Sequence, residues 1–126
     1  NDETDFNLCL KIAVDNNSIN ICKFIIENNH ASKNIVYDVY QLITTSCMWN
    51  KDKTFEYLFG LDKHSIFDIQ QYFNKNIETL MIGNDKNYNI LIFLLNNGAI
   101  VEKSVIEQAK NWNNNDLVNF LSTNLN

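Results

Sequence analysis

The 126-residue sequence has no arginine, no proline and only three glycines. Without arginine, the chain has neither an arginine finger nor a bidentate guanidinium clamp for phosphates or carboxylates. The scarcity of glycine and proline argues against a glycine-rich phosphate loop and against an all-β fold with many tight turns. Ten lysines against fifteen acidic residues give a net charge of −5. This charge argues against nucleic acid and anionic membranes as general partners, because both attract positive charge.

Long hydrophobic runs are also missing, since the longest, Ile90 to Leu95, is far shorter than a membrane-spanning helix. Apolar residues still make up 45% of the chain, enough for the core of a single domain. Cys9, Cys22 and Cys47 are odd in number and each lies in an apolar stretch. We therefore expect free, buried thiols in a reducing compartment such as the cytoplasm. Because the first residue is Asn1 rather than Met, we expect a processed product or a fragment.

The main signal is an internal repeat, in which a polar turn rich in asparagine is followed by an apolar block with an aromatic residue. The aromatic residues are Phe24, Tyr57, Phe93 and Phe120, at spacings of 33, 36 and 27 residues. A small residue recurs in the apolar stripe before the turn, at Ala13, Ser46 and Ala109. This spacing predicts a short helix, a tight turn and a second, more buried helix in each repeat.

The block from Leu10 to Asn29 resembles a unit of the ankyrin-repeat family, in which about 33 residues form two antiparallel helices and a loop. The third block ends with the residues 96–99, Asn-Asn-Gly-Ala, similar to the helix-ending sequence of the family. Gly98 would there have a positive φ. The resemblance covers residues from about Phe6 to Leu125. The Thr-Pro-Leu-His opening of the family is absent, so its hydrogen-bond network must be missing or replaced.

We therefore predict an all-α fold, a short solenoid of about four antiparallel helical hairpins that resembles degenerate ankyrin repeats. The single domain, 1–126, would contain repeats at roughly 6–34, 35–65, 66–101 and 102–126. One long helix is expected from Asn34 to Trp49, and another after Ser65, with few or no β-hairpins. A stack of α-hairpins of another family is the structural alternative.

Residues suited to catalysis or metal binding are few. His30, His64 and the three cysteines lack the Cys-x-x-Cys or His-x-x-x-His spacing of a zinc site, so we interpret them as loop histidines and structural thiols. The acidic run at residues 2–5 is typical of a solvated helix start, and Ser104-x-x-Glu107 predicts a capping box. We expect no enzymatic activity, metal or cofactor. An enzyme or metal protein built on cysteine and histidine is a remote alternative.

Two tryptophans occupy the same repeat position, since Trp49 and Trp112 each lie eight residues before an aromatic residue of the repeat. The ankyrin resemblance implies that this end of the first helix faces a concave groove that contacts ligands. Tryptophan is also enriched in binding hot spots. The candidate partner-binding residues are the two tryptophans, their neighbours and the equivalent residues of the other repeats: Trp49, Trp112, Met48, Asn111, Asn16 and Asp85. The competing interpretation is that each indole packs against an adjacent repeat.

The predicted function is non-enzymatic binding of a protein partner on the concave face, as a scaffold or adaptor, without nucleic acid or membrane. The alternative is a structural component of a larger particle such as a virion, or one part of a longer repeat array. The composition, rich in Asn and Ile and free of Arg, is similar to ankyrin-repeat proteins of large DNA viruses and other AT-rich genomes. In that case we expect the protein to be located in the host cytoplasm or in the virion. An extensive exposed apolar face would favour the assembly role.

Overall fold

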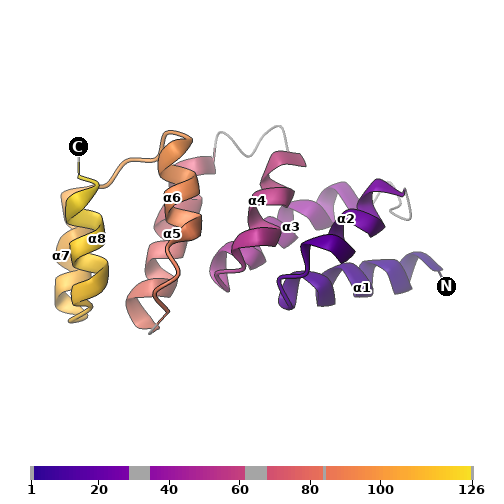
Figure 1. Ribbon diagram of the computed structural model, residues 1–126, viewed down its shortest axis with the longest axis horizontal. Helices are drawn as coiled ribbons and strands as arrows, with labels where there is room; N and C mark the ends of the chain where they lie inside the picture. The colour runs from indigo at the N-terminus through magenta and orange to yellow at the C-terminus, as the bar shows by residue number, and fades with distance from the viewer. Residues whose placement is uncertain (1, 29–34, 62–67, 84, 126) are drawn as a thin grey trace. The chain divides into compact units, whose positions relative to one another are not determined.

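A computed structural model describes the backbone at residues 2–28, 35–61, 68–83 and 85–125, and the side chains at 8–28, 40–61, 68–83 and 85–125. These ranges contain eight α-helices and no strand, which confirms the all-α prediction (Figure 1). The predicted features at Asn29, His30, His64 and Ser65 lie outside them. No helix in the described ranges has the length and apolar character needed to cross a membrane.

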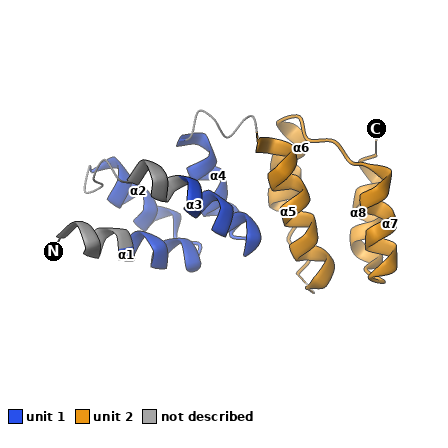
Figure 2. Ribbon diagram, turned by 180° about the vertical axis from the view of Figure 1, so that it is seen from behind, with its two compact units in different colours: residues 1–65 blue, residues 66–126 orange. Residues whose placement is uncertain are grey.

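The chain divides into two compact units, residues 1–65 and 66–126, each with four of these helices (Figure 2). The helices of the first unit are α1 (Asp2–Asp15), α2 (Ile19–Glu27), α3 (Ile35–Met48) and α4 (Asp52–Leu61). Consecutive helices pack as pairs, α1 with α2 and α3 with α4. The two pairs are also in contact, because α1 packs on α3 and α2 on α4. The predicted helix from Asn34 to Trp49 is thus confirmed as α3.

The helices of the second unit are α5 (Ile69–Ile82), α6 (Asn89–Asn96), α7 (Lys103–Asn111) and α8 (Asn115–Thr123). They pack as the pairs α5 with α6 and α7 with α8. Polar side chains link the two pairs. Gln70 on α5 exchanges two hydrogen bonds with the backbone of Ile100, at 2.9 and 3.0 Å. Asn114 donates from Nδ2 to the carbonyl of Leu80 at 2.8 Å.

Three turns within the described pairs share one construction. Asn17, Asn50 and Asn113 have φ angles of 54°, 56° and 57°, the left-handed conformation that asparagine tolerates. In each turn the Asn N–H bonds the carbonyl three residues back, and the next N–H bonds the carbonyl five residues back. This is the Schellman pattern of helix termination. The five-back acceptors are the recurring small residues, all of them buried: Ala13, Ser46 and Ala109.

The turn at Gly98 follows the same pattern, with a φ of 108° as predicted and a bond from the Ala99 N–H to the Leu94 carbonyl. The turn between α5 and α6 differs. Gly83 ends α5 with an extended backbone, and Asp85 and Asn87 then each accept a hydrogen bond from the N–H two residues later. Among the described residues of this turn, no asparagine has the left-handed conformation found at Asn17, Asn50 and Asn113.

The recurring aromatic residues of the second helices lie outside the buried core. Phe24 is 60% exposed, and Tyr57, Phe93 and Phe120 are half-buried. The residue after each aromatic is buried instead: Ile25, Leu58, Leu94 and Leu121. The aromatic position lies beside the core, because one step along a helix turns the side chain by about 100°.

Two further local predictions are wrong. The residue that precedes α7 is Glu102, which makes no side-chain capping bond, so Ser104 lies inside the helix and forms no capping box. Cys9 is exposed rather than buried, because its helix α1 buries Leu10 instead. Cys22 and Cys47 are buried free thiols, as predicted.

Candidate functional site

The two tryptophans directly follow equivalent helices, α3 and α7. Each precedes a left-handed asparagine, Trp49 before Asn50 and Trp112 before Asn113. Their backbone N–H groups still bond the carbonyls of Thr45 and Gln108, four residues earlier. Each tryptophan is therefore the first residue after its helix and lies directly before the turn. Both indoles are exposed, at 67% for Trp49 and 57% for Trp112.

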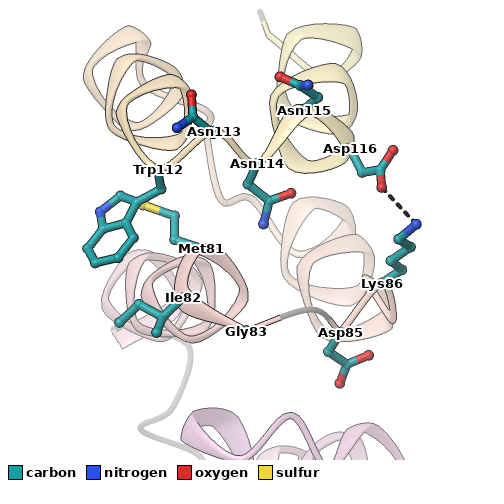
Figure 3. Close-up of a pocket in the computed structure, with 10 residues that line it drawn as sticks. All are labelled: Met81, Ile82, Gly83, Asp85, Lys86, Trp112, Asn113, Asn114, Asn115 and Asp116. Atoms are coloured by element: carbon teal, nitrogen blue, oxygen red, sulfur yellow. Dashed lines mark ion pairs between the residues drawn. The ribbon is translucent and has the colours of Figure 1, made fainter.

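Trp112 lines a groove of about 600 Å³ between the third and fourth helix pairs. Its apolar end is formed by Trp112 with Met81 and Ile82 from α5, as Figure 3 shows. Ile82 is 71% exposed, so this end offers aliphatic as well as aromatic surface. The opposite end is polar, where the Lys86 ammonium pairs with the Asp116 carboxylate at 2.9 Å.

Asn114 lies between the two ends of this groove (Figure 3). Its Nδ2 bonds the Leu80 carbonyl and its Oδ1 accepts from the Leu117 N–H at 3.2 Å, so the amide caps α8 and ties the pairs together. The hydrogen bond to Asp116 raises the pKa of Lys86 and keeps it charged. The groove thus has an anchored polar middle and an apolar end that is open to solvent.

Trp49 lines a comparable groove of about 560 Å³ in the first unit. The opposite wall comes from α1, where Lys11 and Asp15 face Thr45, Trp49 and Lys51. Two lysines and one aspartate line this groove, whereas two aspartates and one lysine line the groove at Trp112. Each groove therefore has an exposed tryptophan, but the charged side chains beside it are mainly positive at Trp49 and mainly negative at Trp112.

The other four predicted residues are exposed, and one of them shares a groove with a tryptophan. Asp85 lines the Trp112 groove, and its Oδ1 accepts from the Asn87 N–H at 2.9 Å. Asn16 bonds back to the Ile12 carbonyl through its Nδ2 at 2.9 Å. Met48 and Asn111 lie just before the tryptophans and are not among the residues that line these two grooves.

A polar cluster between the first two pairs was not predicted from the sequence. Asn17 donates from Nδ2 to the Asp52 carboxylate at 2.8 Å, and its Oδ1 accepts from the Thr54 backbone N–H at 3.1 Å and hydroxyl at 3.3 Å. The cluster joins residues more than 30 positions apart. The available signal was the recurrence of asparagine in the polar turns, at positions 17, 50 and 113.

The chemistry of Cys22 fits a structural role. Burial raises the pKa of Cys22 from 9.0 to about 11, so its thiol stays protonated at neutral pH. Within the described residues, no group of three or more His, Cys, Asp and Glu side chains is placed to hold a metal ion. His30 and His64 lie outside these residues.

Comparison with models of known protein families, with curated protein sequences and with solved structures finds no match to this chain. The resemblance to ankyrin repeats and the solenoid arrangement thus stay predictions from the pattern of residues. The geometry of the two tryptophan grooves has to be interpreted from its own chemistry.

Proposed function

We propose that this chain is a non-enzymatic protein-interaction module on an ankyrin-like helical scaffold, and that Trp49 and Trp112 anchor its protein partner. The observation that carries the proposal is the exposure of both indoles at equivalent helix ends, each on the rim of a groove. An exposed indole leaves a large apolar surface in water, and covering that surface stabilises a complex. Tryptophan is also the residue most typical of binding hot spots.

The shape and chemistry of the grooves favour a polypeptide as the ligand. Both are open and mix apolar with charged side chains, unlike the enclosed apolar pockets of small-molecule sites. The Trp112 groove suits a segment with one apolar side chain against Trp112 and Ile82 and with polar groups near Asn114. The net charge of −5 disfavours nucleic acid as that partner.

The experiment is a quantitative affinity capture with the purified chain from an extract of the cells that produce it. The Trp49→Ala and Trp112→Ala variants are compared with matched variants of the same units, Tyr40→Ala and Ile100→Ala, which remove side chains that are 48% and 50% exposed. We expect to find a protein that the intact chain and both matched variants capture in similar amounts. The captured amount of this protein should fall about tenfold or more with at least one tryptophan variant. Retention by all four variants alike would refute the assignment of these anchors.

A further inference from the structure

The shared turn sets a common register for three of the helix pairs. Asn17, Asn50 and Asn113 occupy the same place in the first, second and fourth pairs, so equivalent residues lie 33 and 96 positions after those of the first pair. This register allows the contacts of one pair to be compared with those of another. It also identifies the side of each pair that faces the pair before it.

In the second pair, that side is marked by α4. Thr54 is fully buried and bonds Asn17 of the first pair through its N–H and its hydroxyl. Tyr57 donates to the Glu27 carboxylate at 3.1 Å, and the Lys23 ammonium lies 5.6 Å from the centre of its ring. Both side chains therefore face the preceding pair.

In the fourth pair, α8 repeats the arrangement. Leu117, the equivalent of Thr54, is fully buried, and the ring of Phe120, the equivalent of Tyr57, lies 4.7 Å from that of Tyr88 in the preceding pair. The first helices agree with this. Thr45 and Gln108 occupy equivalent positions, and each shares a groove with the first helix of the pair before it.

The first pair carries apolar residues at these positions, and they are about half exposed. Ile21 occupies the place of Thr54 and Leu117 but is 50% exposed, whereas those two residues are fully buried. Ile12 occupies the place of Thr45 and Gln108 and is 49% exposed. The surface continues one turn away on each helix, with Leu8 at 57% and Phe24 at 60% exposure. We call these four residues the leading face.

We propose that the leading face is a docking surface for one further antiparallel helix pair, which stacks on the first pair as the first pair stacks on the second. The argument is continuity with an interface already present, because the second pair uses the same positions to contact the first. Four large apolar side chains at half exposure also form the kind of surface that marks an interaction site.

The leading face also defines the chemistry of its occupant. In the first unit, Asn17 and Glu27 are bonded by the hydroxyls of Thr54 and Tyr57. Ile21 and Phe24 have no hydroxyl, so an asparagine or glutamate opposite them would lose its partner in a dry interface. The occupant must therefore present aliphatic groups at those places.

This requirement disfavours a second copy stacked head to tail. The outward positions of the fourth pair, equivalent to Lys11, Asp15, Asn17, Lys23 and Glu27 of the first, are all polar and exposed: Glu107, Asn111, Asn113, Asn119 and Thr123. The third pair comes closer, since Ile92, at the place of Lys23, is 45% exposed and Ile82 is 71% exposed, although Asn96 occupies the place of Glu27. Its outward surface is thus a suitable probe.

The experiment fuses a copy of residues 68–102 in front of Asp2 of the full chain. In the chain this segment leads directly into α7, and in the fusion it leads directly into α1. We expect the amides of α2 to exchange with solvent about tenfold more slowly in the fusion than in the chain. The same fusion with Ile12→Lys and Ile21→Lys should show no slowing. Equal exchange in the unsubstituted fusion and in the chain would overturn the proposal.

Two measurements on the chain itself keep the proposal testable if the fusion does not fold. We expect Ile21→Lys to leave the urea midpoint unchanged, since Ile21 is half exposed in the free chain. A lowered midpoint would place Ile21 in the core and overturn the proposal. We also expect a monomer in sedimentation equilibrium. A dimer that Ile21→Lys dissociates would assign the leading face to a second copy and overturn the proposal equally.

Discussion

Replacing Asn17 by glycine tests whether the cluster between the first two helix pairs stabilises their packing. Glycine adopts the φ of 54° at this position without strain, so the backbone of the turn is retained. The substitution removes the side-chain bonds to Asp52 and Thr54. The change therefore isolates the contribution of the amide from that of the turn.

The size of the effect follows from the character of these bonds. The 2.8 Å bond to Asp52 involves a carboxylate that is 7% exposed, and bonds to charged groups contribute roughly 1.5–3 kcal/mol. The bond from the Thr54 N–H contributes about 1 kcal/mol more. We expect Asn17→Gly to lower the free energy of unfolding by about 2.5–4 kcal/mol. Asn17→Ala should cost about 1–2 kcal/mol beyond that, because alanine disfavours the left-handed conformation.

The matched control is Asn113→Gly, which changes the same kind of turn at an exposed side chain. Its free energy of unfolding should stay within about 0.5 kcal/mol of that of the original chain. Urea unfolding followed by far-ultraviolet circular dichroism provides both values, and amide exchange in α3 and α4 assigns the loss to the first unit. Equal effects of Asn17→Gly and Asn113→Gly would refute the stabilising role of the cluster.

Three further predictions concern single residues. Gln70→Ala removes two hydrogen bonds to the backbone of Ile100, so it should lower the free energy of unfolding by about 1–2 kcal/mol. The Ile100 amide should also exchange faster with solvent, and an unchanged exchange rate would contradict the prediction. Unfolding should become easier as the pH rises from 9 to 11, because folded Cys22, with its pKa raised to about 11, keeps a proton that the unfolded chain releases. The share of Cys22 is roughly 1–3 kcal/mol, and a Cys22→Ala variant with the same alkaline loss would disprove it. Iodoacetamide should label the exposed Cys9 much faster than the buried Cys22 and Cys47, as measured by mass spectrometry of the labelled peptides. The opposite order of labelling would contradict this prediction.

Local features of the fold were predictable from the sequence. The apolar periodicity predicted α3 to within a residue at each end, and the helix-ending motif predicted the positive φ of Gly98. Such features depend on neighbours within one or two helical turns. The choice between adjacent apolar residues was not predictable in the same way. Phe24 and Ile25 both fit a helical stripe, and only the packing of the pairs buries Ile25 and exposes Phe24.

The candidate site was predictable in part. The equivalent position of Trp49 and Trp112 followed from spacing, and the polar Asn16 at the same place in the first repeat was a signal that the position faces solvent. The grooves were not predictable, because their opposite walls come from helices about 30 residues away. The bonds of Asn17 were missed for the same reason, since Asp52 and Thr54 are 35 and 37 residues distant.

The most direct test of the proposed function is hydroxyl-radical footprinting of the chain alone and in complex with the protein that it captures. Both indoles are exposed, so Trp49 and Trp112 should be oxidised readily in the free chain. In the complex, we expect at least one of them to be protected about tenfold, while Tyr40 is oxidised at the same rate in both states. Equal oxidation of both tryptophans in the free and bound chain would contradict the account.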